Sequence, residues 1–353
     1  MTDPNTRRRR RLAASLVLSL LFVTAGCSAG PKTASTQPRP LVKAVFSNVA
    51  PKVDGRDEQV WGKAPAASIK IIKTGEIIQV KAIYTKTRIY VKAYYPDQTH
   101  DYIDRPWVFD GTRWKQKGQQ DSLCFIWNIN DSIRGFNERG FSILTQGLEE
   151  NRHPWEIMIN GGSVRQAPAW FKQQEGDFWS TGLQLPYGKA EDWVLKYNQS
   201  VWANGDWNLR LVNQHDQYPN SAPWVLNKAT DWSQPIWRLR DGLTIKKDPY
   251  PVRADLVDIA GYQPQPGEVQ PFIIYSSRQA RWGGSKDDID GAEGWNKGFW
   301  TVEMGRPLNT GHNDDIQFAP EKQSVYTFGL LARRRGSQYE PTGPVSFEFE
   351  PRK

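Results

Sequence analysis

The stretch EIIQVKAIYTKTRIYVKAYYPD, Glu76 to Asp97, decides the fold class. Within it, residues 77–84 and 88–95 alternate apolar and polar side chains with the two-residue period of half-buried β-strands. The connection between them, residues 85–87, is short enough for a hairpin. We therefore predict that the two runs pair as antiparallel neighbours.

Three further segments alternate in the same way, and long amphipathic helical patterns are nearly absent. The chain has 24 prolines, which disfavour helices and interior sheet ladders alike. We predict an all-β protein, an immunoglobulin-like β-sandwich with long aromatic-rich loops, in which residues 147–255 form a long irregular insertion. The 16 tryptophans fit either a core or an aromatic ligand surface. The three segments are SLCFIWNI (122–129), FWTVEMG (299–305) and SVYTFGLLA (324–332).

The N-terminus has the pattern of a lipoprotein signal peptide. Five arginines, residues 7–11, precede an apolar run that ends in VTAGC, with Cys27 at the position where a diacylglycerol would be attached. We expect residues 1–26 to be a signal peptide, residues 27–40 a flexible linker, and residues 41–353 the folded domain. An ordinary secretory signal with a chance cysteine is the alternative. Lipidation predicts an extracytoplasmic protein anchored to a membrane, on the periplasmic side in a Gram-negative cell.

The charge gives little support for a nucleic-acid partner. The formal charge is +8, but residues 1–26 contain five basic residues and one acidic residue, so the remainder carries +4. Nucleic-acid binding requires a concentrated basic patch, and we predict no such partner.

The residues also argue against several kinds of reactive site. If Cys27 is acylated, Cys124 is the single remaining cysteine, and its apolar surroundings predict a buried side chain. The histidines are scattered, and the acidic run KDDIDGAEG (286–294) has only part of a calcium-loop pattern. We predict no metal site and no catalytic residues; enzymatic activity is undecided, with a binding or electron-transfer subunit favoured over an independent enzyme.

Three stretches resemble one family. They are similar to the haem-binding domain shared by the ethylbenzene dehydrogenase γ-subunit, the related dimethylsulfide and selenate oxidoreductase subunits and cytochrome c-552-like proteins. The first part also resembles family 9 carbohydrate-binding modules, and the resemblance extends from about Val42 to Phe349. The stretches are NVAPKVDGRDEQVWGKAPAASIKI (48–71), RPWVFDGTRWKQKGQQDSLCFIWNINDSI (105–133) and GAEGWNKGFWTVEMGRPLNTGHNDDIQFAPEKQSVYTFGLLA (291–332).

The resemblance implies a haem site whose covalent attachment residues are missing. In the segment FNERGFSILTQG (136–147), Phe141 and Thr145 stand where the cysteines of a c-type haem would be, and Gln146 where the histidine would be. Covalent haem c is therefore excluded at this segment. Non-covalent haem b would take an axial ligand from Met158 or His153.

The position of the second ligand argues against haem. Relatives place a lysine or histidine near the C-terminus, where this chain has Gly343 and Pro344, which have no donor atom in their side chains. Two hypotheses stay open. One is a lipoprotein that binds haem b and transfers electrons to a redox protein partner. The other is a haem-free binding or assembly module for a redox partner or a carbohydrate.

Overall fold

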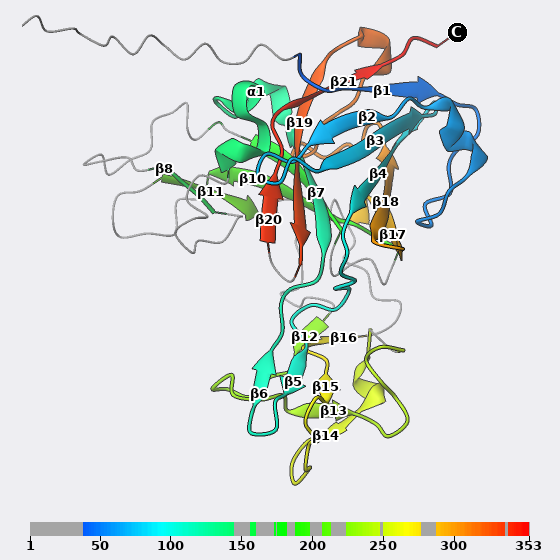
Figure 1. Cartoon of the computed structure of the whole chain (residues 1–353). Coiled ribbons are helices and arrows are strands. Elements are labelled where there is room, and N and C mark those ends of the chain that lie inside the picture. The colour runs from blue at the N-terminus through cyan, green and yellow to red at the C-terminus, as the bar shows by residue number, and fades with distance from the viewer. Residues whose placement is uncertain are drawn as a thin grey trace, which may run out of the picture. The chain divides into compact units, whose positions relative to one another are not determined.

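The computed structural model describes residues 38–144, 156–159, 173, 175–181, 188–197, 207–212, 224–247, 250–276, 287–335 and 338–352. The largest element is a mixed sheet of fourteen strands (Figure 1), in the order β17-β18-β4-β3-β1-β21-β19-β7-β9-β10-β11-β8, with β2 paired to β3 and β20 to β19. The strands are β1 Leu41–Phe46, β2 Ala67–Lys70, β3 Ile77–Tyr84, β4 Arg88–Pro96, β7 Ser122–Asn128, β8 Glu156–Ile159, β9 Glu175–Ser180, β10 Glu191–Tyr197, β11 Trp207–Val212, β17 Asp290–Asn296, β18 Phe299–Pro307, β19 Tyr326–Arg334, β20 Gln338–Pro341 and β21 Val345–Phe349.

The predicted hairpin is present as β3 and β4. The two strands are antiparallel, with Tyr84 opposite Ile89 and Gln79 opposite Tyr94. Alternate residues of β3 are fully buried at Ile78, Val80 and Ala82, because one face of the strand packs on the core. The three other alternating segments form β7, β18 and β19, so the prediction of an all-β sandwich is confirmed.

Residues 147–255 contain strands that the sequence analysis did not predict. Among them, β9 pairs with β7 and β10 pairs with β9, so both continue the large sheet. Their inward-facing positions include Asp177 and Asp192, which are buried. These buried carboxylates interrupt the apolar alternation by which a strand is recognised in a sequence.

The large sheet curls so that its end at β17 and β18 meets the part formed by β9 and β10. The segment before β10 contacts the start of β17, where Lys189 and Asp290 form a β-bridge and the amide of Ala190 donates to the carbonyl of Ile289 at 3.0 Å. Arg306 of β18 donates to a carboxylate oxygen of Asp177 in β9 at 2.7 Å, and both side chains are fully buried. The curled sheet encloses the main hydrophobic core, to which most of its strands contribute.

Short strands form a second group. They make three small sheets, β15-β5-β6, β12-β16 and β13-β14, which are coloured cyan to yellow in Figure 1. The fully buried Asn227 joins them, since its amide nitrogen donates to the carbonyls of Trp237 and Pro271 and its amide oxygen accepts from the amides of Ile236 and Trp237. The strands are β5 Trp107–Phe109, β6 Trp114–Gln116, β12 Trp224–Leu226, β13 Trp237–Leu239, β14 Leu256–Asp258, β15 Val269–Gln270 and β16 Ile273–Tyr275.

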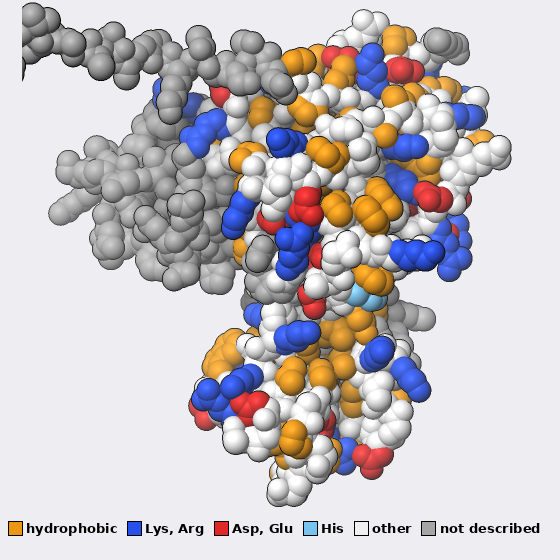
Figure 2. All heavy atoms as spheres, viewed as in Figure 1, with side chains coloured by type: hydrophobic (Ala, Val, Ile, Leu, Met, Phe, Trp, Pro, Cys, Tyr) orange, Lys and Arg blue, Asp and Glu red, His pale blue; other side chains and the backbone are white. Residues whose placement is uncertain are grey.

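Helices are short. They are α1 Phe136–Arg139 and the 3-10 helices η1 Gln59–Lys63, η2 Ile129–Asp131, η3 Gly140–Leu144, η6 Arg253–Asp255 and η8 Pro320–Lys322. Across the described ranges, none of the helices has the length and apolar character needed to cross a membrane. On the face drawn in Figure 2, basic and acidic side chains are interspersed with hydrophobic ones.

We expect Arg306→Met to lower the free energy of unfolding by about 3–5 kcal/mol, because it leaves the buried carboxylate of Asp177 without its cation. Urea denaturation followed by tryptophan fluorescence measures the change. The matched control is Arg238→Met, which removes an ion pair of the same 2.7 Å length to Asp241, whose side chain is 91% exposed. The control should cost no more than about 1 kcal/mol. Equal losses in the two variants would show that the buried pair is not what holds the sheet ends together.

Candidate binding site

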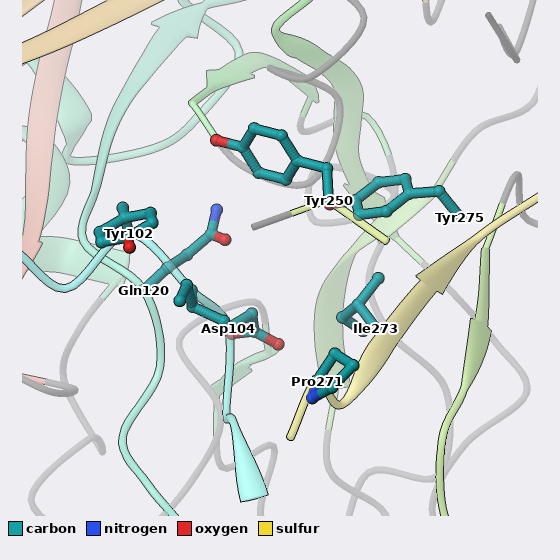
Figure 3. Close-up of a pocket in the computed structure, with 8 residues that line it drawn as sticks. Tyr102, Asp104, Gln120, Tyr250, Pro271, Ile273 and Tyr275 are labelled. Carbon is teal, nitrogen blue, oxygen red and sulfur yellow. The ribbon is translucent and has the colours of Figure 1, made fainter. Parts of the chain in front are cut away.

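A narrow crevice lies where the segments that flank β5 and β6 meet β16. Its empty volume is about 250 Å³, including the part open to solvent. Figure 3 shows Tyr102 on one side, Pro271 and Ile273 on the other, and the polar ends of Asp104 and Gln120 between them. The full lining is Tyr102, Ile103, Asp104, Gln120, Tyr250, Pro271, Ile273 and Tyr275.

The tyrosines of the crevice are held by neighbouring groups. The hydroxyl of Tyr102 donates to the carbonyl of Lys246 at 3.2 Å. The rings of Tyr250 and Tyr275 meet edge to face with centroids 5.8 Å apart. His100 lies against Tyr102 with ring centroids 4.5 Å apart and stacks on Trp295 of β17 at 4.9 Å. The crevice is therefore supported from both the large sheet and the small sheets.

The polar groups of the crevice are nearly buried. Asp104 and Gln120 are 7% and 6% exposed. The guanidinium of Arg105 donates to the carboxylate of Asp104 at 2.7 Å and compensates its charge. A carboxylate and an amide at this depth can orient a ligand, because buried polar groups need hydrogen-bond partners.

Two further acidic groups, Asp121 and Glu293, lie near the crevice: Asp121 follows Gln120 in the sequence, and the charge of Glu293 acts on Tyr250. Burial, together with the nearby carboxylate of Asp121, raises the pKa of Glu293 to about 8. Burial and the charge of Asp97 raise the pKa of Asp121 to about 7, although Asp121 accepts hydrogen bonds from the amide of Asp101 and the indole of Trp300. Burial and the charge of Glu293 raise the pKa of Tyr250. Perturbed titratable groups beside a crevice mark a candidate functional site.

A second cavity is larger but chemically poorer. It has an empty volume of about 770 Å³, including open solvent, and is lined by Tyr84, Pro320, Glu321, Gln323, Pro351 and Arg352. The guanidinium of Arg352 lies over the rings of Phe46 and Tyr84, so the aromatic surface is already covered. The crevice is the better candidate because several aromatic and polar side chains converge on it.

Most residues predicted as sites fall outside what the structure describes. Cys27, His153, Thr145 and Gln146 lie outside the described residues. Met158 lies in β8, opposite Asn208 of β11, with its side chain outside the description.

The segment that should hold haem is closely packed instead. Phe141 is 2% exposed and contacts the ring of Phe178 in a small hydrophobic cluster. A Cβ atom on Gly140 would lie 2.3 Å from backbone atoms of Gly343 and Pro344. The two segments that would carry the attachment residues and the second axial ligand thus touch through their backbones. The residues present do not fit a porphyrin between them.

Comparison with known proteins corrects the predicted family. No family model matches the chain, and no curated protein matches its sequence. Similar solved structures include a family 9 carbohydrate-binding module from Caldicellulosiruptor kristjanssonii in complex with glucose, with 8% identity, a TM-score of 0.34, and coverage of 88% of this chain and 97% of the module. The same kind of module in complex with cellotriose has 9% identity, a TM-score of 0.34 and coverage of 89% and 95%. The assignment to the haem-binding, ethylbenzene dehydrogenase-related family, with its haem-binding and electron-transfer roles, was therefore wrong.

The sequence analysis missed the residues of the crevice. Tyr102, Asp104 and Gln120 lie in turns beside short strands, and Tyr250 lies far from them in the chain. No periodic pattern joins these positions. The available signal was compositional, an enrichment of aromatic residues in the loops, and it does not identify individual side chains.

We expect Gly140→Ala to destabilise the protein by about 3 kcal/mol or more, because a Cβ atom would clash with the backbone at residues 343–344 and the φ of +55° disfavours a side chain. Chemical denaturation measures the loss. Gly343→Ala is the control from the other side of the same contact, since its added Cβ would meet nothing within 4 Å. It should change stability by less than about 1 kcal/mol. If Gly140→Ala is equally mild, the close packing of the two segments is wrong.

We expect stability to fall as pH rises from about 5 to 8, and Glu293→Gln to reduce this slope. The raised pKa, about 8 against an ordinary 4.5, means that folded Glu293 keeps its proton where the unfolded residue has lost it. The folded state then binds more protons, so the free energy of unfolding decreases with pH in this window. Urea titrations at several pH values measure the slope. Glu321→Gln, which removes an exposed carboxyl, serves as the control, and a Glu293→Gln slope equal to wild type would refute the assignment.

Proposed function

We propose that this protein is a non-catalytic binding module for carbohydrate and that the crevice at Tyr102, Asp104 and Tyr250 is its ligand site. The observation that carries the proposal is the convergence of three tyrosine rings with a buried carboxylate and a buried amide in one crevice. The proposal agrees with the haem-free binding-module hypothesis and takes the saccharide as the ligand.

The chemistry of a sugar matches this lining. A pyranose ring has apolar C–H faces and a rim of hydroxyl groups. Tyrosine rings can cover the C–H faces, because they combine a large apolar surface with a polar tip. The carboxylate of Asp104 can only accept hydrogen bonds, whereas the amide of Gln120 can both accept and donate, so together they can satisfy adjacent hydroxyls.

The size of the crevice restricts the ligand. Sites for drug-sized molecules usually have volumes of about 300–1,000 Å³. The space enclosed by the crevice is far smaller, about 10 Å³, which is room for roughly one water molecule. We therefore propose that a single sugar residue lies across the mouth of the crevice, against its tyrosine rings and polar groups, and not inside it.

The N-terminal pattern suggests where binding takes place. With Cys27 lipidated, the linker of residues 27–40 would display the domain at an extracytoplasmic membrane surface. We propose a surface-anchored binding role on this basis. Metabolic labelling with a fatty-acid probe would test it, since Cys27→Ser should abolish incorporation.

We expect calorimetric titration of the protein with glucose and cellotriose to detect binding. Asp104→Asn should weaken affinity by at least about tenfold, because a hydrogen bond to a charged group contributes about 1.5–3 kcal/mol. Tyr250→Ala should weaken it similarly by removing an aromatic wall. The control is Tyr94→Ala on β4, which removes a tyrosine that is 43% exposed and lies outside the crevice lining.

Two outcomes would contradict the proposal. One is a wild-type protein that binds none of a broad panel of saccharides. The other is binding that Tyr94→Ala weakens as much as Asp104→Asn and Tyr250→Ala do, which would place the sugar elsewhere on the protein.

A further inference from the structure

Three aspartates far apart in the sequence meet inside the curled sheet. Asp177 lies in β9, Asp192 in β10, and Asp315 in the segment between β18 and β19. Each offers a carboxylate oxygen, and these oxygens all lie within 4.8 Å of one another. The strand register explains the first two, because Asp177 is opposite Val194, two residues from Asp192, so both side chains lie on the same face of the sheet.

Several of these oxygens have no hydrogen-bond donor. Asp177, Asp192 and Asp315 are 0%, 2% and 4% exposed. Asp177 Oδ1, Asp192 Oδ2 and Asp315 Oδ2 have no donor in hydrogen-bonding geometry among the described residues, although the Asp192 carboxyl lies against that of Asp177 and Thr310 lies near Asp315. Buried carboxylate oxygens are rarely left in this state, so each one calls for an explanation.

The positive charge supplied by the protein is too small to balance the cluster. Arg306 donates to Asp177 Oδ2 at 2.7 Å and reaches Asp192 Oδ2 only at 4.0 Å. The amide of Ile316 also donates to Asp177 Oδ2, at 2.9 Å, which leaves the other oxygen of Asp177 open. Three carboxylates beside one guanidinium leave two negative charges, which is the charge that one divalent cation neutralises.

We propose that Asp177, Asp192 and Asp315 form a buried calcium-binding site that joins the loop between β18 and β19 to strands β9 and β10. The donor set consists of oxygens, which are the preferred ligands of hard cations, and it contains no sulfur or imidazole that would favour zinc or copper. Oxygens on opposite sides of a calcium ion lie roughly 5 Å apart, so a spacing of up to 4.8 Å is covered. The smaller Mg²⁺ spans only about 4.2 Å and would require the strands to move closer together.

The site differs from the calcium option weighed in the sequence. That option concerned the acidic run at residues 286–294. The three aspartates instead come from strand β9, strand β10 and the loop between β18 and β19. The sequence analysis predicted no metal site because the ligands are separated by up to about 140 residues and have no spacing motif. The proposed role is structural and does not depend on the saccharide proposal, since none of the three aspartates lines the crevice.

The competing explanation is that the cluster holds protons in place of a metal ion. Burial raises the pKa of Asp192 and, to about 8, that of Asp315, and the charge of Asp177 acts in the same direction on both. Shared protons would relieve the repulsion without any cation. The two explanations differ in one measurable respect, which is the response to calcium at constant pH.

The test is thermal unfolding and calorimetric titration of the full chain at pH 7.5, after EDTA treatment and dialysis, with CaCl2 or MgCl2 alone as the added ligand. We expect one calcium per chain and a Tm increase of about 5 °C at a calcium concentration near 100 times Kd. We expect Asp315→Asn to weaken calcium binding by at least about tenfold. Magnesium should give a smaller shift than calcium.

Asp241→Asn is the control, because it removes an exposed aspartate outside the cluster and should keep the full calcium response. Asp315→Asn is also informative without calcium: it should fold and be at least as stable as the EDTA-treated wild type, since it relieves charge repulsion. If wild type shows no calcium-dependent shift, or if Asp315→Asn binds calcium as tightly as wild type, the calcium site is refuted. If Asp315→Asn changes the Tm relative to wild type by the same amount in the presence and in the absence of calcium, shared protons explain the cluster instead.

Discussion

The buried ion pair between Arg306 and Asp177 is the constraint on which the rest of the structure depends. It joins β18, near one end of the large sheet, to β9, near the other end, and both side chains are fully buried. Arg306 also donates to the carbonyl of Ile316 and lies over the ring of Trp179, 5.0 Å from its centroid. One side chain thus links two strands, a loop and the aromatic core. A buried pair of this kind cannot lose one member cheaply, because the other charge would stay in the core without compensation.

Curling of the sheet also determines where a ligand can bind. The chain leaves the sheet after β4, forms β5 and β6, and returns as β7, so residues at both exits lie close together. Tyr102 and Asp104 lie where the chain leaves the sheet after β4, and Gln120 lies where it returns before β7. The segment that brings Tyr250 and Ile273 completes the crevice. The crevice is thus a product of the connections between sheets, where loops supported by a rigid scaffold commonly carry binding residues.

The resemblance to haem-binding domains rested on scaffold residues, whereas ligation depends on particular atoms. Trp61 and Trp300, which belong to the matched stretches, are core residues and are each 2% exposed. Such residues report how a sandwich packs. At the segment where haem chemistry would occur, Gly140 and Phe141 pack against backbone and aromatic neighbours instead. A resemblance carried by packing residues therefore does not identify a ligand site.

The sequence by itself determined the all-β class and the hairpin of β3 and β4, because a two-residue alternation of buried and exposed positions is a local property. It also determined that FNERGFSILTQG cannot attach haem covalently, because the required thiols and imidazole are missing. Only the tertiary structure decided that β9 and β10 belong to the sheet, since their inward face carries Asp177 and Asp192 and breaks the apolar pattern. It alone brought Asp315 to these aspartates and Tyr250 to Tyr102. The physical reason is the same in each case: these groups meet through sheet curvature and strand register, which depend on contacts between residues far apart in the chain.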